Sequence, residues 1–510
     1  MDDTDRNRYN SDGTMDELAE ARASLALLEE QERQLLERLC NVRSGVRVQR
    51  KRIDELVKRL IPPPISRLPI TVLDQIFHLA VNDGDWSVFA NLYTKEKLAR
   101  VSRRWRNVIL TTPGLWTNIA INPRWSASLV SAHVTRSREC PLDIEICFWD
   151  FNDEFPRFCE LLGLVISCGY RWRSLVIQFN HENLEGRIIR RLWDVMFASL
   201  KRAVIDVTHK VDYPPFLDPQ HARTLEYLDL GEGIELDNFS AAASLKSLCL
   251  KYPPLTAPLL LSITSLRTLT ISGPNCGALL PDSIHFPLLE SLTVKLEDPR
   301  SFLGAVVTPR LGYFTWSLPE LSTRWSVIFA DLEGKFPNVQ HLCLQFSENS
   351  ASYAHIQDAV AIYAAFPGVR HIEMDMLDFL AFCEAGWDDT PLSTADRWTH
   401  LERLSLVQLH CEDVIDSFIE WLHARKLRGR PPLQVTLSEL NADDDVLKSP
   451  WLISLYNSLH ECCVLELKDL PLTFDLTLTV HPSDSDVYGN PPIIGMLESA
   501  ISTQLVYRNK

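Results

Sequence analysis

Apolar residues between residues 15 and 61 recur with a period of seven, on two sets of positions that together form a seam. The first set is Leu18, Leu25, Leu39, Val46, Ile53 and Leu60, and the second set is Ala21, Leu28, Leu35, Val42 and Leu56. Glu32 and Gln49 interrupt the seam. A sustained repeat of 3.5 residues keeps one side of a helix facing a partner helix, so residues 15–61 are predicted to form a coiled-coil helix that associates in parallel or antiparallel pairs. A long surface helix packed on its own domain is the alternative.

The next segment begins with Pro62, Pro63 and Pro64, which end the helix because proline lacks a backbone donor and its ring clashes with the preceding turn. Two stretches then place apolar residues every three or four positions, as one face of a helix does. They are ISRLPITVLDQIFHLAV and KEKLARVSRRWRNVIL, and the turn TTPGLW follows the second. Residues 62–120 are therefore predicted to form two or three short amphipathic helices.

Beyond about residue 170 one short pattern repeats: an apolar residue, two others, an apolar residue, one other and an apolar residue. The copies are WRSLVI from Trp172, LEYLDL from Leu225, LKSLCL from Leu245, LRTLTI from Leu266, LESLTV from Leu289, LGYFTW from Leu311, VQHLCL from Val339, VRHIEM from Val369 and LERLSL from Leu401. From Leu225 onward the copies start 20 to 32 residues apart. Periods of this size are typical of a solenoid in which each repeat supplies one strand and one returning segment.

The composition of the 510 residues is that of a soluble globular chain, with 46% hydrophobic and 23% charged residues. No apolar run approaches the ~18 residues of a membrane span, and the polar residues 1–14 do not resemble a signal peptide, so this start is expected to be disordered and the protein cytoplasmic. Twelve cysteines without a CxxC pair favour reduced thiols. The net charge of -16 argues against nucleic-acid binding and favours protein partners.

No catalytic, cofactor-binding or metal-binding motif stands out. The segment GEGIEL imitates the start of a dinucleotide-binding loop, but Leu236 replaces the third glycine, so a repeat turn is predicted. His400, His410 and Cys411 lack the second ligand pair of a zinc site. The basic run RVQRKR occupies mostly outer positions of the coiled coil, with a nuclear import signal as the alternative. The chain is therefore expected not to be an enzyme.

The segment from residue 62 to about residue 120 resembles the F-box (an F-box-like domain) in the form common in fungal F-box proteins. The resemblance rests on Leu68-Pro69 before the first helix, Ile76-Phe77 within it, Val101 and Trp105 in the later helix, and the closing PGLW. The insertion NDGDWSVFANLYTKEK makes the loop between the first two helices longer than in a minimal F-box. In that family the F-box binds a Skp-type adaptor, which joins it to a cullin-based ubiquitin ligase, and the following domain selects the substrate.

This resemblance implies which residues contact the adaptor. They are Leu68, Pro69, Ile76, Phe77, Val101 and Trp105. A module this small has little interior, so Phe77, Val101, Trp105 and Trp116 suit its core equally well. Both interpretations stay open for these four residues.

The repeated strands look like leucine-rich repeats, which would occupy residues 121–475 and leave residues 476–510 as a tail. That family places Asn or Cys three residues after the last apolar position, where the side chain binds the backbone of the turn. Here the corresponding residues are Gly233, Pro253, Pro274, Glu297, Pro319 and Ser347. The turns must satisfy their backbone groups in another way, so an irregular α/β leucine-rich-repeat-like solenoid is expected after the helical part.

Strand side chains alternate, so residues between the inward apolar positions must face the opposite way. This rule predicts a stripe of substrate-binding residues: Tyr227, Asp229, Lys251, Tyr313, His341, Gln345, His371, Glu373 and Arg403. Tyr and Arg are enriched among residues that dominate binding energy at interfaces. An ordinary solvated strand face, with substrate held by the loops after Trp316, is the alternative.

The sequence as a whole predicts a protein without catalytic residues or cofactors. The two resemblances imply the substrate-recognition subunit of an SCF complex in the ubiquitin conjugation pathway, with one surface for a Skp-type adaptor and another for a protein substrate. A scaffold that binds partners through its coiled coil and repeats, without a link to a ligase, is the alternative.

Overall fold

The computed structural model describes residues 5–467 with internal gaps. The gaps are residues 61–64, 66–67, 83–87, 148–154, 179–181, 237–238, 241–242, 252–262, 276–278, 319–323, 347–354, 384–391, 408–411 and 439–458. The predicted tail at residues 476–510 lies outside the described residues, as do His410, Cys411, Pro253, Pro319 and Ser347. The chain divides into two compact units, Met1–Gly273 and Pro274–Lys510.

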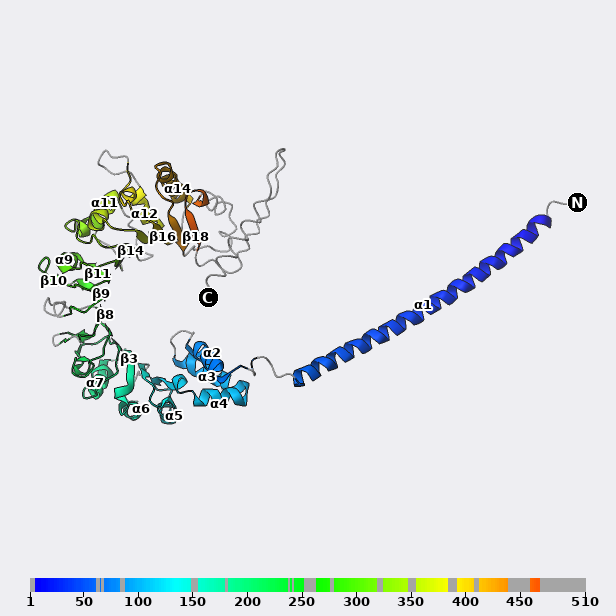
Figure 1. The fold of residues 1–510 in the computed structure, drawn as a ribbon, viewed down its shortest axis with the longest axis horizontal. Helices are drawn as coiled ribbons and strands as arrows, with labels where there is room; N and C mark the ends of the chain where they lie inside the picture. The colour runs from blue at the N-terminus through cyan, green and yellow to red at the C-terminus, as the bar shows by residue number, and fades with distance from the viewer. Residues whose placement is uncertain are drawn as a thin grey trace. The chain divides into compact units, whose positions relative to one another are not determined.

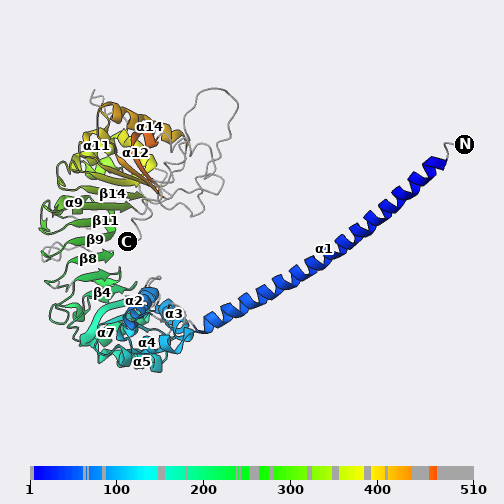
Figure 2. The ribbon, with the colours of Figure 1, turned by 45° about the vertical axis from the view of Figure 1, so that its right-hand side comes forward.

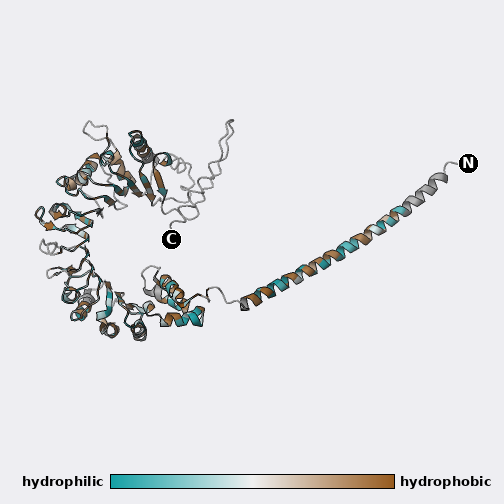
Figure 3. Cartoon of the chain, viewed as in Figure 1, coloured by the Kyte–Doolittle hydropathy of each residue, from teal (hydrophilic) through white to brown (hydrophobic). Residues whose placement is uncertain are grey.

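A single helix of 56 residues, α1 (Asp5–Leu60), forms the start of the first unit (Figure 1). It begins ten residues before the predicted start, so the expected disordered segment is helical from Asp5 onward. Between residues 17 and 57 every described side chain except Glu30 is exposed, including the apolar residues of the seam. Figure 3 shows apolar and polar residues alternating along this helix, which buries neither kind within the chain.

Three short helices follow: α2 (Ile70–Asn82), α3 (Val88–Val101) and α4 (Arg103–Thr111). We call them, with the 3-10 turn Pro113–Trp116, the helical module. The stretch expected to be a loop is helical from Val88, and the single helix expected over KEKLARVSRRWRNVIL is broken at Ser102. There the Ser102 hydroxyl caps α4 by accepting a hydrogen bond from the Trp105 N–H at 3.1 Å.

The core of the helical module is small and fully apolar. Its buried members are Leu73, Phe77, Val81, Val108, Ile109, Leu115 and Trp116. The Trp116 indole N–H donates to the Ile109 carbonyl at 2.8 Å, which satisfies the one polar atom of this ring. The closing turn therefore fastens onto α4 by burial and by a hydrogen bond.

The strands of the first unit form a parallel sheet in the order β1-β2-β3-β4-β6-β8-β9. The strands are β1 (Asn118–Ile121), β2 (Leu142–Cys147), β3 (Trp172–Gln178), β4 (Arg202–Asp206), β6 (Tyr227–Leu230), β8 (Ser247–Lys251) and β9 (Thr268–Asn275). Helices α5 (Ala127–Ser137), α6 (Phe155–Ile166) and α7 (Glu182–Leu192) lie between the first four strands in the sequence. Strands β1, β2 and β4 were not predicted.

The strands of the second unit are also parallel, in the order β11-β13-β14-β15-β16-β17-β18. They are β11 (Ser291–Asp298), β13 (Tyr313–Leu318), β14 (His341–Phe346), β15 (His371–Asp375), β16 (Arg403–Val407), β17 (Gln434–Ser438) and β18 (Val464–Leu467). The connecting helices are α9 (Arg300–Ala305), α10 (Trp325–Phe329), α11 (Ile356–Ala365), α12 (Met376–Cys383), α13 (Thr394–Arg397) and α14 (Glu412–Leu427). Figure 2 shows these strands side by side.

The repeated apolar residues face inward, as predicted. In each of the nine copies all three apolar positions are buried, from Trp172, Leu175 and Ile177 to Leu401, Leu404 and Leu406. Paired strands bring the same position of successive copies together, so that Leu228 lies opposite Leu248 and Leu248 opposite Leu269. Burying these stacked side chains supplies the main driving force for folding of the sheet.

Short polar side chains before the strands bind backbone carbonyls of the neighbouring segment. Thr224 donates to the carbonyls of Ala198 and Leu200, and Ser244 donates to those of Arg223 and Leu225, at 2.8 to 3.2 Å. Ser265 donates to the Leu245 carbonyl at 2.7 Å. All three stand immediately before the first apolar residue of a copy, so hydroxyl groups on the entry side of the strand bind the preceding repeat.

The fold is therefore mixed, with one long helix followed by a large parallel sheet with helices. Every helix in the described part of the chain is too short or too polar to cross a bilayer.

Candidate protein-binding surfaces

The helical module leaves several apolar side chains uncovered although its core is small. Ile70, Ile76 and Leu79 on α2 are exposed, as are Val101 on α3 and Leu110 on α4. Single exposed apolar residues are ordinary, but five on three short helices are candidate contacts for a protein partner. Ile70 and Leu79 lie about 180° apart around α2, so the five do not all share one face. We call these five residues the apolar surface of the module.

The predicted adaptor residues separate into two groups. Pro69, Ile76 and Val101 are exposed, and Leu68 is half-buried against the core. Phe77 is 0% exposed, so it forms the core rather than a contact surface. Trp105 is half-buried, with its ring centroid 4.9 Å from that of Phe77. Both a core position and a surface contact were left open for these side chains. Phe77 and Trp116 lie in the core, and Val101 lies on the surface.

A buried lysine joins the helical module to α5 (Ala127–Ser137). The Lys95 ammonium group donates to the Leu115 carbonyl at 3.0 Å and lies 3.4 Å from Nε2 of His133 on α5. Burial lowers the pKa of Lys95 to about 8. Burial, with help from the Lys95 charge, lowers the pKa of His133 to about 3, so this imidazole stays neutral and can accept from Lys95.

Aromatic rings enclose this polar contact. The His133 ring lies 4.8 Å from the rings of Trp116 and of Trp125, and the Arg136 guanidinium lies 4.4 Å from the Trp116 ring. Lys95, His133 and Trp116 thus belong to one packed cluster, which we call the joint. No sequence pattern indicated it, because Lys95 and His133 are 38 positions apart.

In the first unit, the predicted stripe residues Tyr227, Asp229 and Lys251 lie on the face of the strands opposite the apolar ladder. All three are half-buried. The Lys251 ammonium group donates to the Asp206 carboxylate at 3.1 Å. The Arg202 guanidinium lies 4.9 Å from the centre of the Tyr227 ring. Charges on this part of the stripe are therefore mostly neutralised by neighbours within the chain.

In the second unit, four predicted stripe residues form a row across neighbouring strands. The strand register places Tyr313 opposite His341, His341 opposite His371, and His371 opposite Arg403. The Tyr313 and His341 rings lie 5.3 Å apart, and the two histidine rings lie 4.1 Å apart. Tyr313 and Arg403 are exposed. We call these four residues the aromatic row.

The next position along the strands adds polar groups to the aromatic row. The His341 ring lies 3.8 Å from the Glu373 carboxylate and holds the pKa of that carboxyl below its usual range. His371 shares a hydrogen bond of 2.9 Å with the Ser405 hydroxyl. Gln345 is exposed at the far end of β14. This face thus combines ring surface, both signs of charge and hydrogen-bonding groups, which is the composition of protein interfaces.

The Cys343 thiol beside the aromatic row is buried. Burial, reinforced by the Glu373 charge, raises the pKa of Cys343 to about 12. Only a thiolate acts as a nucleophile or a metal ligand, so this cysteine suits neither role near neutral pH. Within the described residues, no group of three or more His, Cys, Asp or Glu side chains could hold a metal ion.

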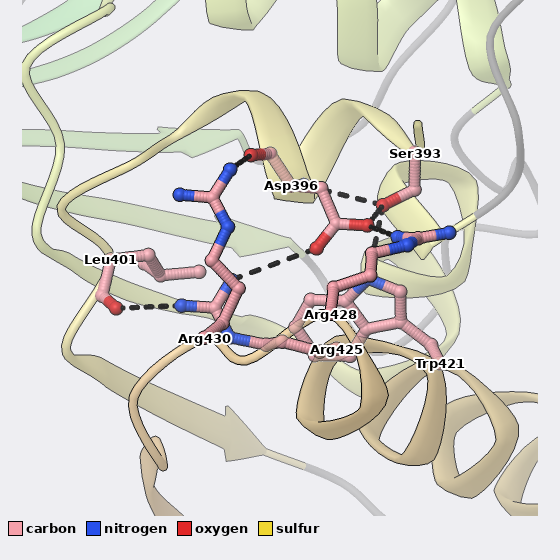
Figure 4. Close-up of polar contacts among 7 residues, drawn as sticks. All are labelled: Ser393, Asp396, Leu401, Trp421, Arg425, Arg428 and Arg430. Atoms are coloured by element: carbon pink, nitrogen blue, oxygen red, sulfur yellow. Dashed lines mark hydrogen bonds and ion pairs between the residues drawn. The ribbon is translucent and has the colours of Figure 1, made fainter. Parts of the chain in front are cut away.

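A buried charged cluster in the second unit is shown in Figure 4. The Asp396 carboxylate on α13 accepts hydrogen bonds from the Ser393 hydroxyl and from Arg428, and Arg425 on α14 lies 3.7 Å from it. Arg425 also donates to the Leu401 carbonyl at 3.1 Å, at the start of a repeat. The cluster therefore ties α13, α14 and the entry to β16 together from within the fold.

The glycine-rich segment GEGIEL forms a repeat turn, as predicted. Its Ile234 and Glu235 are strand β7, which pairs in parallel with β5 (Val211–Asp212). A Cβ atom at Gly233 would lie 2.3 Å from the His209 carbonyl oxygen. This glycine is thus explained by a close approach of two backbones and not by a bound phosphate.

No protein-family model matches the chain, and no curated protein matches its sequence.

Proposed function

We propose that this protein is a substrate-recognition subunit of an SCF-type ubiquitin ligase, with an F-box-like helical module and a leucine-rich-repeat-like solenoid. The module would bind a Skp-type adaptor through its apolar surface. The solenoid would bind a protein substrate through the stripe, above all through the aromatic row. The protein would contribute proximity and no catalytic group, because holding a substrate lysine near a conjugating enzyme raises its effective concentration.

The observation that carries the adaptor assignment is the exposure of Ile76, Leu79 and Val101 on a module whose buried core is small. Burial of apolar area is worth about 25 cal/mol per Å², so covering these side chains would favour association. The joint supports the same function. Because the contact between Lys95 and His133 holds the module against α5, an adaptor on the module would stand at a set position relative to that helix.

The aromatic row supports substrate binding on the solenoid. Its rings are held by neighbouring strands rather than by loops, so little conformational entropy is lost when a partner covers them. Half-buried His341 and His371 leave Tyr313 and Arg403 as the projecting side chains at its two ends. Such a row fits a protein segment with apolar and hydrogen-bonding groups.

Adaptor capture tests the proposed function. The double variant Ile76→Asp with Val101→Asp places charges at two exposed positions, so it should fold normally and lose capture of a purified Skp-type adaptor by at least tenfold. Leu427→Asp, at an exposed residue of α14, is the matched control and should leave capture unchanged. Wild-type capture by the double variant would reject the adaptor surface. Failure of the wild-type protein to bind any Skp-type adaptor would leave the scaffold without a ligase as the function.

A further inference from the structure

The seam of α1 is uncovered along its whole described length. Its large apolar side chains between Leu25 and Leu56 are 44 to 63% exposed. Soluble proteins rarely leave a continuous apolar stripe of this length in water. No described residue of α1 is buried. The seam therefore calls for an occupant from outside the chain.

The charges of α1 divide it into two halves of opposite sign. Residues 17–37 hold six acidic residues, Glu17, Glu20, Glu29, Glu30, Glu32 and Glu37, against Arg22 and Arg33. Residues 38–57 hold six basic residues, Arg38, Arg43, Arg47, Arg50, Lys51 and Arg52, against Asp54 and Glu55. A second copy lying antiparallel would bring each acidic half against a basic half, whereas a parallel copy would bring like charges together.

The two polar interruptions of the seam select one antiparallel alignment. Glu32 belongs to the first set of positions and Gln49 to the second, and reversing one helix brings the first set of each helix against the second set of the other. When Glu32 is placed opposite Gln49, the remaining layers are entirely apolar. These layers are Leu25 with Leu56, Leu28 with Ile53, Leu35 with Val46, and Leu39 with Val42. A parallel in-register pair would instead bury Glu32 against Glu32, which is unfavourable.

We propose that α1 forms an antiparallel homodimer in which Glu32 of one copy faces Gln49 of the other, with its centre between Cys40 and Asn41. The occupant of the seam is a second copy of this chain. The arrangement is independent of the proposed ligase function, because it involves neither the helical module nor the stripe. Gly45 lies outside the seam, where the missing side chain leaves no hole in the interface.

Disulfide trapping in the full-length protein tests the orientation. Leu28→Cys and Ile53→Cys are introduced into two differently tagged chains, each in a Cys40→Ser background, and the chains are mixed and oxidised. Facing positions should yield a disulfide-linked dimer that carries both tags, because cysteines bond only when their Cα atoms come within about 7 Å. Each chain alone should yield at least tenfold less. Self-linking of the Leu28→Cys chain would show a parallel pair and overturn the proposal.

A charge-rescue experiment tests the antiparallel pairing independently, in case a cysteine variant associates poorly. Leu35→Glu and Val46→Lys should each turn the full-length dimer into a monomer in sedimentation, and mixing the two should restore a dimer, because these positions face one another. Leu27→Glu, at an exposed residue outside the seam, is the matched control and should remain dimeric. A monomeric wild-type protein, or a mixture that stays monomeric, would overturn the antiparallel homodimer.

Discussion

The Lys95 ammonium group is buried without a carboxylate partner among the described residues. Its neighbours are the Leu115 carbonyl and the neutral His133 ring. Such an environment favours the uncharged amine, which is the physical reason for its lowered pKa. Keeping Lys95 charged in the joint therefore lowers the free energy of unfolding of the first unit, by an amount that depends on pH.

We expect the stability of the first unit to rise with pH between about pH 8 and 10.5, relative to a Lys95→Met variant. In this window the unfolded chain still binds the Lys95 proton and the folded chain does not, so raising the pH favours folding. The relative gain should be about 3 kcal/mol over the whole window, and chemical denaturation at several pH values would measure it. A pH-independent difference between the two proteins would contradict the buried, perturbed amine.

A second prediction concerns the contribution of Asp396 to the stability of the second unit. Asp396→Asn should destabilise the second unit by about 3–5 kcal/mol, because it leaves buried Arg425 and its neighbour Arg428 without their carboxylate. Asp298→Asn removes a half-exposed partner of Arg300 and should cost less than about 1 kcal/mol. Thermal unfolding of both variants would measure the difference. Equal unfolding midpoints would show that the cluster contributes little.

The sequence predicted whether a side chain is buried for some residues and not for others. The inward positions of the repeats followed from alternation along the strand, and all are buried. Phe77 could not be assigned to the core or to the surface, because its helix has apolar residues on more than one face. The joint and the Asp396 cluster could not be predicted at all. Their partners are far apart in the chain, and nothing local marks Lys95 or Asp396 as buried.

The repeat pattern was recognised in nine strands and overlooked in others. Trp116, Ile119 and Ile121 have the full spacing of a copy at β1, as do Leu200, Ala203 and Ile205 at β4. Strand β2 lacks that spacing because Pro141 occupies the first position. The break between α3 and α4 was also missed, since helical periodicity continues through Ser102. Only the serine, as a possible cap, distinguishes that position.

The return segments stabilise the strands through stacked phenylalanines. Phe366 is buried, and its ring lies 4.8 Å from Phe314 and 5.2 Å from Phe336. We expect Phe366→Ala to destabilise the second unit by about 3–5 kcal/mol in urea denaturation, because a large cavity would remain. Tyr313→Ala on the opposite, exposed side of the strands should cost less than about 1 kcal/mol. Comparable losses would contradict the division into a packed and an open face.

The aromatic row can be tested as a unit of the sheet. Replacing Tyr313, His371 and Arg403 by Ala should reduce substrate co-purification at least tenfold and leave adaptor capture unchanged, since the module is a separate element. Val327→Ala with Leu427→Ala changes exposed residues elsewhere in the same unit and serves as the control. Full substrate recovery by the folded triple variant would place substrate binding in the loops or on other strands.

At the scale of the whole molecule, α1 buries no described residue against the rest of the chain. A protein that starts at residue 62 should therefore keep the proposed adaptor capture and the unfolding transition of the full chain, while losing the proposed dimer in sedimentation. Loss of adaptor capture on this deletion would mean that α1 supports the module, contrary to the exposure of its seam.

The length of α1 sets the distance between the two folded parts of the proposed dimer. Its centre lies about 20 residues before Leu60, so at about 1.5 Å per residue the two copies of Leu60 would stand about 60 Å apart, at opposite ends of one rod. Two receptors held at that spacing would bind a substrate with two copies of the same motif far more tightly than either alone, because the second contact forms within one complex. The rod would then discriminate between targets by the distance between their motifs, favouring multimeric substrates over their separate subunits.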